Sequence, residues 1–208
     1  MPFRGYDELV ETVGDWLARG DLSPQIKDFI WIAECDLQRQ IRFRMLDKTF
    51  SGVSVAGQNY IDLPNDYAEG GFLNWTSNRS LPSIEVVSYD ITAGHQRDAS
   101  GDASVGTIHG DRLLIGRAPG EVEYDLFYKA GVEHLGGEIQ TNHILQEYPD
   151  CLLFGALTVA SPYLGADERI GTWANMYDNA KEETRMAEWR GRSGHGVLRM
   201  RSDVSHLR

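Results

Sequence analysis

Residues 151–163 read Cys-Leu-Leu-Phe-Gly-Ala-Leu-Thr-Val-Ala-Ser-Pro-Tyr, a run that is apolar nearly all round when it is wound as a helix. Pro149 suits the first turn of that helix, because proline lacks only an N–H that would be unpaired there anyway. A helix without a polar face needs cover on every side, so we predict that it is central and buried. Pro162 and Gly165 are expected to end or kink it.

Two amphipathic helices are predicted near the start of the chain. In residues 7–19 the apolar residues recur on one side, and Gly20 can end the helix. The pair Ser23-Pro24 then supplies an N-cap and a first-turn proline for a second helix. The apolar stripe of this second helix spans residues 26–45, and the helix counted from Ser23 would be roughly 35 Å long.

A last long helix is predicted over residues 167–190. Its apolar seam recurs at spacings of three and four residues, which is typical of a helix that packs along a neighbouring helix. The seam consists of Ile170, Trp173, Tyr177, Ala180, Thr184 and Ala187. A shorter helix is indicated just after Thr141-Asn142.

Between these helical parts the apolar pattern changes to that of strands. Residues 51–55 and 59–63 flank Ala-Gly-Gln, which predicts a short hairpin. Residues 112–116 and 121–128 are the clearest strands, with Pro119-Gly120 as the turn between them. The polar stretch 94–106 is expected to be an exposed loop.

We therefore predict an α+β protein with a helical body, in which the N-terminal and C-terminal helices pack together, a central β insertion and an extended C-terminal tail. The expected divisions are residues 1–49 for the N-terminal helices, 50–131 for the β insertion, 132–190 for the C-terminal helices and 191–208 for the tail. A chain of 208 residues is long enough for such a core.

Charge is divided unevenly along the chain. Residues 185–208 carry six arginines and two acids, a net of +4, while the whole chain is −11, so residues 1–184 carry −15. Three glycines in residues 191–196 predict that this segment is not helical. Val197-Leu198-Arg199-Met200-Arg201 then alternates apolar and basic residues, as a strand does.

This tail is predicted to dock on another molecule, either by adding a strand to a sheet edge or by placing apolar side chains in a groove. Its 18 residues would reach roughly 60 Å when extended. The alternative is a frayed terminus without a function. Five apolar residues among the arginines argue against that alternative: Val197, Leu198, Met200, Val204 and Leu207.

The sequence contains no pattern of a catalytic, metal or cofactor site. The six histidines form no HxxxH or HxH pair, Cys35 and Cys151 have no CxxC partner, and neither a G-x-S-x-G nor a Walker motif occurs. We therefore expect no enzymatic activity, no metal and no cofactor, although a metal site assembled from distant residues stays open. Both cysteines are expected to be buried free thiols.

Several residue classes have ordinary structural explanations. The first eight residues lack a signal-peptide core and no run is long enough to cross a membrane, so we expect neither export nor membrane insertion. The acidic net charge argues against a body that grips nucleic acid.

Arg39, Arg42 and Arg44 are expected to form a solvated helix face. The tryptophans are expected to be core or subunit-contact anchors: Trp16, Trp31, Trp75, Trp173 and Trp189, of which only Trp189 has basic neighbours.

The order and spacing of several short motifs over residues 6–190 resemble a known family. The motifs are Tyr6-Asp7-Glu8-Leu9, Trp16-Leu17-Ala18-Arg19-Gly20-Asp21-Leu22, Leu63-Pro64-Asn65-Asp66-Tyr67, Leu113-Leu114-Ile115-Gly116-Arg117-Ala118-Pro119, Tyr148-Pro149-Asp150 and Asp167-Glu168-Arg169-Ile170. This pattern resembles the head-to-tail adaptor (connector) proteins of tailed bacteriophages.

The resemblance implies a structural protein of the virion neck, made in the host bacterial cytoplasm. It implies a ring of twelve copies beneath the portal that links capsid and tail and forms part of the DNA channel. The implied partners are the portal ring, neighbouring copies and a downstream tail or nozzle protein, with genomic DNA passing through the lumen without specific binding. The candidate portal-binding residues are Arg192, Val197, Leu198, Arg199, Met200, Arg201, Val204, Leu207 and Arg208.

Two other functions stay open at this point. The chain would also fit a tail-completion or baseplate component. A nucleic-acid-binding module whose Arg/Gly-rich tail folds on DNA or RNA is the alternative from another class.

Overall fold

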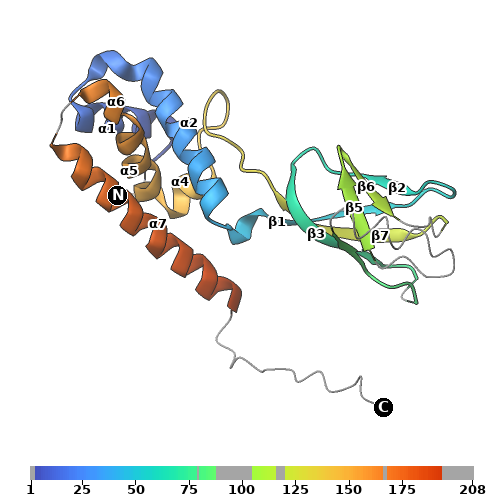
Figure 1. Ribbon diagram of the computed structural model, residues 1–208. Helices are drawn as coiled ribbons and strands as arrows, with labels where there is room; N and C mark the ends of the chain where they lie inside the picture. Colours follow the sequence, from blue (N-terminus) through green and yellow to red (C-terminus); the bar gives the residue numbers. More distant parts are fainter. Residues whose placement is uncertain (1–2, 79, 88–104, 116–119, 166–167, 194–208) are drawn as a thin grey trace. The chain divides into compact units, whose positions relative to one another are not determined.

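The computed structural model describes residues 3–78, 80–87, 105–115, 120–165 and 168–193 (Figure 1). The chain divides into two compact units: a helical unit, Met1–Arg44 with His134–Arg208, and a β unit, Met45–Glu133. Helices from both ends of the chain share the first unit, and the second holds a curled mixed sheet. The predicted α+β class is confirmed.

Helix α5 (Pro149–Val159) is the centre of the helical unit, as its sequence predicts. It packs against α1 (Tyr6–Leu17), α2 (Ser23–Gln40), α4 (His143–Glu147) and α7 (Arg169–Ser193). Cys151, Leu152, Leu153, Gly155, Ala156 and Leu157 are all buried. The helix ends before Pro162, which lies in the short helix α6 (Ser161–Leu164), and Gly165 follows with a positive φ of 67°.

Helix α1 ends at Leu17, earlier than Gly20, where an end was predicted. Ala18 takes the left-handed conformation (φ 53°), and its N–H and that of Arg19 bond to carbonyls of the last helical turn. These bonds satisfy carbonyls that the helix end would otherwise leave unpaired. A 3₁₀ turn, η1 (Gly20–Leu22), leads into α2.

The start of α2 differs from the prediction in one detail. Pro24 lies in the first turn as expected, but Ser23 is itself the first helical residue and makes no side-chain cap. Its hydroxyl instead donates to the carbonyl of Gly20 at 3.3 Å.

Helix α2 ends at Gln40, so the prediction that it continues to Met45 was wrong. Ile41 is extended (φ −122°, ψ 129°), and Ile41 and Phe43 are both buried. Alternate residues of an extended chain lie on the same side, so the apolar positions continue in the core after the helix ends. Met45, in the 3₁₀ turn η2 (Arg44–Leu46), is 59% exposed.

Helix α7 carries most of the predicted seam. Trp173, Tyr177, Ala180 and Thr184 are buried. In the last turns, however, the buried residue is Glu188 at 3% exposure, whereas Ala187 is exposed. The apolar spacing therefore placed the end of the seam one residue too early.

The glycine-rich segment that follows begins as helix, which corrects the prediction that it is non-helical. Helix α7 includes Gly191 and ends at Ser193. A Cβ at residue 191 would lie 2.7 Å from Nη1 of Arg44, so the glycine lets the helix pass this side chain. The rest of the segment and the predicted tail from residue 194 lie outside the described residues.

The described residues of the β unit form seven strands in the order β1-β7-β3-β4-β5-β6-β2. The strands are β1 (Asp47–Val53), β2 (Tyr60–Asp62), β3 (Tyr67–Trp75), β4 (Ile84–Val86), β5 (Val105–His109), β6 (Arg112–Ile115) and β7 (Glu123–Ala130). All described pairs are antiparallel except β4 with β5. Leu73, Ile84, Leu113, Ile115 and Leu126 are among its core residues.

One expected strand pairing is wrong, and a second pair of predicted strands does not pair directly. The predicted hairpin of residues 51–55 and 59–63 does not form, because β1 pairs with β7 and β2 pairs with β6. Strands β6 and β7 exist where the sequence predicts strands, but β6 pairs with β5 rather than with β7. Part of the turn between them lies outside the described residues.

The polar stretch expected to be a loop ends differently from the prediction. Residues 94–104 lie outside the described part, but Gly106 is buried within strand β5. A Cβ at this glycine would lie 2.9 Å from the carbonyl oxygen of Leu114 on the paired strand β6, so only a glycine fits this close approach.

Candidate interaction surfaces

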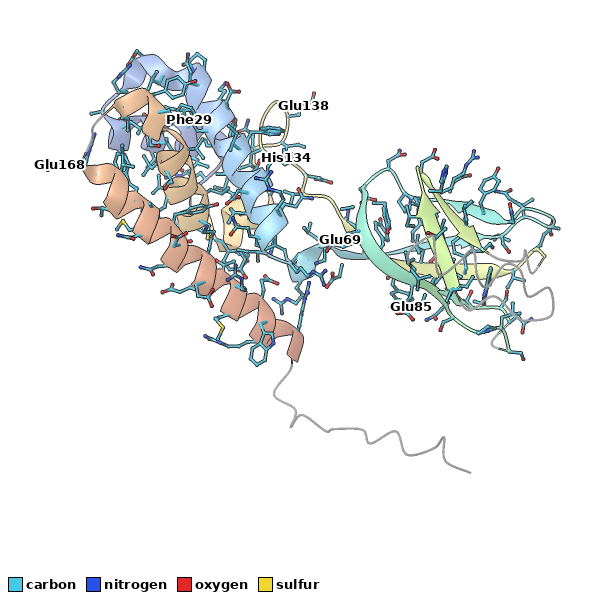
Figure 2. The ribbon with its side chains drawn as sticks, in the orientation of Figure 1. Phe29, Glu69, Glu85, His134, Glu138 and Glu168 are labelled. Atoms are coloured by element: carbon cyan, nitrogen blue, oxygen red, sulfur yellow. The ribbon has the colours of Figure 1, made fainter. Side chains whose placement is uncertain are left out.

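The carboxylate of Glu34 on α2 is fully buried and holds the segment through which the chain returns from the β unit. It accepts the backbone N–H of Leu135 at 3.1 Å and the side-chain amide of Asn142 at 2.6 Å. Nδ1 of His134, a residue labelled in Figure 2, lies 3.2 Å from Oε2. Burial raises the pKa of the Glu34 carboxyl, although these hydrogen bonds act to lower it.

A second buried carboxylate, Glu188 on α7, holds the segment through which the chain leaves for the β unit. Its Oε2 accepts the backbone N–H of Arg44 and its Oε1 accepts the hydroxyl of Tyr148, both at 2.7 Å. The ring of His143 packs edge-on against those of Phe43 and Tyr148, and its Nε2 lies 3.8 Å from Oε1 of Glu188. Burial, and then the bond to Glu188, raise the pKa of Tyr148.

These two carboxylates have structural roles. Each accepts a backbone N–H and a side-chain donor, and such partners offset the cost of burying a charge. Neither carboxylate was predicted from the sequence. For Glu34 the signal in the sequence was Asn142, whose Oδ1 caps α4 by accepting the N–H of Leu145 at 3.0 Å while its amide donates to Glu34.

The cysteines are free thiols, as predicted, but only Cys151 is fully buried. Its Sγ lies 3.2 Å from Oγ1 of Thr184, and burial raises its pKa to about 11. Burial also raises the pKa of the partly exposed Cys35. The thiolate is the reactive form of cysteine, so neither residue is an activated nucleophile.

Two further findings concern only the described part of the chain. No group of three or more His, Cys, Asp or Glu side chains there is arranged to hold a metal ion. None of the described helices combines the length and apolar character needed to cross a membrane.

The structure places one of the candidate portal-binding residues. Arg192 is exposed in the last turn of α7. The others lie outside the described residues: Val197, Leu198, Arg199, Met200, Arg201, Val204, Leu207 and Arg208.

The expected arginine face of the second helix is only partly present. Arg39 is on α2, its side chain 70% exposed and 3.4 Å from Asp36. Arg42 and Arg44 follow the end of the helix, and the guanidinium of Arg44 lies against Gly191. These arginines therefore do not share one helix face.

Large apolar side chains are exposed at several places on the helical unit. On α2 they are Trp31 (51% exposed) and Ile32 (40%), and on α7 they are Met176 (39%), Met186 (42%) and Trp189 (58%). Trp16 and Tyr163 are also exposed, whereas Trp75 and Trp173 are buried. Tryptophans are therefore divided between core and surface. Where exposed apolar groups form a contiguous patch, they commonly mark a contact surface.

The β unit exposes a smaller aromatic surface. Phe72 on β3 stacks on Phe127 of β7, with ring centroids 4.7 Å apart and an interplanar angle of 14°. Glu85 lies opposite Phe72 in the ladder. Residues 45–133 contain thirteen acidic and six basic residues, a net of −7, so this unit contributes much of the negative charge of the chain.

Comparison with known proteins gives one family. The family model described as SU10 adaptor protein matches residues 4–201, which is nearly the whole chain. No curated protein matches the chain at a significant level. The extent of the family match confirms the resemblance read from the sequence motifs. This chain belongs to the SU10 adaptor protein family and is a structural adaptor protein of a bacteriophage.

Proposed function

We propose that this adaptor forms a ring of twelve copies beneath the portal, links the capsid to the tail and forms part of the DNA channel. The match of the family model to residues 4–201 is the observation that carries this proposal. Portal protein, neighbouring copies and a downstream tail or nozzle protein are the proposed partners, and the virion neck is the proposed location.

The anchor to the portal is the basic C-terminal segment. Helix α7 ends in Arg190 and Arg192, both exposed, and the sequence then continues with the apolar-basic alternation of residues 197–201. Alternation of this kind supports strand addition to a sheet edge, in which backbone hydrogen bonds give affinity and alternate side chains give specificity. The arginines would meet acidic residues of the portal.

The acidic body has a second role in the proposal. Residues 1–184 carry a net charge of −15, and like charges repel the phosphate backbone of DNA. A lumen lined by such a surface lets DNA pass without sticking. A lumen lined by lysine and arginine would contradict this part of the proposal.

Native mass spectrometry of portal rings mixed with the purified chain tests the proposal. We expect twelve copies to add to each portal ring, and none when the chain is truncated after Ser193. This truncation keeps all of α7, so its circular dichroism should still show the helical content of the full chain. Unimpaired attachment of the truncated chain would contradict the role of the segment as anchor.

A matched pair of variants separates apolar docking from charge. Replacing Leu198 and Met200 by serine should abolish attachment at every salt concentration. Replacing Arg199 and Arg201 by glutamine should weaken attachment mainly at low salt, because exposed charges are screened as salt increases.

The nucleic-acid-binding alternative predicts the opposite result in a DNA titration. Binding of DNA through several arginines falls steeply as salt increases. Tight, salt-sensitive binding of DNA with no mass added to the portal would favour that alternative. No binding to either partner would favour a tail-completion or baseplate component.

A further inference from the structure

Two helices of the helical unit expose apolar groups away from the buried core. Helix α2 buries Ile30, Ala33 and Leu37, whereas Trp31 and Ile32 are exposed. Helix α7 buries Trp173, Tyr177 and Ala180, whereas Met176 and Met186 are exposed. Both helices pack on α5 through their buried residues. The exposed apolar groups are therefore not covered by the central helix.

The exposed positions on each helix form a face. On α2, Cys35 lies one turn after Trp31 and Ile32 and between them around the helix axis, and Arg39 follows one turn later. We call these four residues the α2 face. On α7, Met176, Asn179, Glu183 and Met186 recur at spacings of three and four residues and so share one side of the helix; we call this the α7 face. All its members are exposed.

Within one copy, α2 and the segment that follows it meet α7 in the same chain direction. The hydroxyl of Tyr177 donates to Asp36 at 2.9 Å, a separation of 141 positions in sequence. Further along, the N–H of Arg44, in the 3₁₀ turn η2 after the end of α2, bonds to Glu188, a separation of 144 positions. Both contacts follow the chain in the same direction and pair residues that differ by 141 to 144 positions.

A register of 144 positions makes the α2 and α7 faces complementary. Met176 follows Ile32 by 144 positions, and Glu183 follows Arg39 by 144 positions. One alignment thus brings an apolar pair and an opposite-charge pair together. An antiparallel arrangement about the same apolar pair would bring Arg39 to Arg169, which places like charges together.

We propose that the α2 face of one copy packs against the α7 face of a second copy, with the helices parallel and in this register. Ile32 and Trp31 then cover Met176, and Arg39 meets Glu183. Because two different surfaces meet, the contact repeats from copy to copy, and it closes into a ring when the rotation between neighbours is that of a cyclic arrangement. The inference rests on the proposed ring, in which a small rotation between neighbours keeps the helices nearly parallel and a cyclic arrangement keeps them level.

The native Cys35 provides a direct test. It lies in the α2 face, and the residue 144 positions later is Asn179 in the α7 face. In full-length chain carrying Asn179→Cys, mild oxidation should link Cys35 of one copy to position 179 of the next. Since each copy then has both ends of the link, we expect a ladder of dimers, trimers and larger species in a denaturing gel without reductant.

The controls are chosen to isolate the geometry. Asp178→Cys introduces an exposed cysteine on another side of α7, and it should give no ladder under the same oxidation. Asn179→Cys combined with Cys35→Ser should also give none. Dimers alone would indicate a two-fold contact and overturn the proposal.

Oxidation is carried out on the free chain at high concentration and on the chain mixed with portal rings. A ladder in either sample supports the contact, including when no portal complex forms and the proposed function fails. Absence of the ladder in both samples overturns the contact, including when portal complexes do form.

A charge-reversal pair gives an independent readout. Arg39→Glu should weaken self-association at least tenfold in sedimentation velocity, because it places two acids opposite each other. Adding Glu183→Arg to that variant should restore association. Failure of the second change to rescue the first would contradict the proposed Arg39–Glu183 contact.

Discussion

The backbone N–H of Arg44 donates a hydrogen bond to Oε2 of Glu188 at 2.7 Å, across 144 positions of the chain. The last turns of α7 thereby fix the point where the chain leaves the helical unit. Glu34 does the same for the returning segment through the N–H of Leu135. Each passage between the units is thus held, on the helical side, by a buried carboxylate.

Glu188→Gln should lower the free energy of unfolding by about 1–3 kcal/mol, because the amide replaces one of two acceptors by a donor and leaves a buried group unpaired. Urea denaturation measures this difference. Glu183→Gln, on the exposed side of the same helix, should change stability by less than about 0.5 kcal/mol. Equal effects of the two changes would show that the bonds to Arg44 and Tyr148 contribute nothing.

Gly155→Ala should destabilise the helical unit by about 1–3 kcal/mol through overpacking. A Cβ there would lie 2.9 Å from Cβ of Ala33 and 3.0 Å from the ring of Tyr177, where α5 touches both α2 and α7. Gly171→Ala is the matched control, since nothing lies within 4 Å of a Cβ at that site. The control should stabilise by up to about 1 kcal/mol through helix propensity, so thermal unfolding should show shifts of opposite sign.

Glu34 should make the protein less stable as pH rises. Burial raises the pKa of its carboxyl in the folded state, so the folded protein holds this proton when the unfolded chain has lost it. The stabilising contribution is therefore complete below the unfolded glutamate pKa of about 4.3 and is lost as pH rises through the higher folded value. Denaturation should be measured for the wild type and for Glu34→Gln across this pH window. As pH rises, the free energy of unfolding of the wild type should fall relative to that of the variant. A difference that does not change with pH would contradict the assignment.

Asp66 should show the opposite pH dependence in the β unit. It accepts Nζ of Lys48 and the hydroxyl of Tyr128, both at 2.7 Å, and the bond from Lys48 is the main cause of its lowered pKa. Its contribution is present above the unfolded aspartate pKa of about 3.9 and is lost as pH falls through the lower folded value. Asp66→Asn should therefore reduce stability at neutral pH, with a deficit that shrinks in acid.

The Tyr128 phenol gives a second readout for the same variant. Burial, and then the bond to Asp66, raise its pKa to about 12. In Asp66→Asn its ultraviolet titration should move to lower pH, and an unchanged titration would show that burial alone sets this pKa.

The spacing of apolar residues correctly predicted those features of the helical unit that depend on a single helix. The apolar character of residues 151–163 required cover on every side, and α5 is indeed central. The seam of α7 followed from spacing as far as Thr184. These features depend on residues within a few turns of each other, so they can be predicted from the local order of residues in the chain.

Partners distant in sequence decided the rest. The apolar residues after Gln40 fit the pattern of a continued helix as well as that of an extended chain. The segment is extended because Phe43 packs beside His143 and Tyr148, which are distant in sequence. Strands β1 and β2 are adjacent in sequence, yet β1 pairs with β7 and β2 pairs with β6. The pairing with β6 places Ile61 of β2 in the core of the β unit, whereas β1 is an exposed strand at one end of the strand order.

The amino-acid sequence by itself determined the class of the fold, the central helix, the family and the separation of an acidic body from a basic end, because each follows from composition or short-range spacing. Tertiary structure alone decided which strands pair, where α2 ends and that Glu34 and Glu188 are buried. A buried carboxylate is stable only when backbone and side-chain donors converge on it, and those donors come from residues that lie together only in the folded chain.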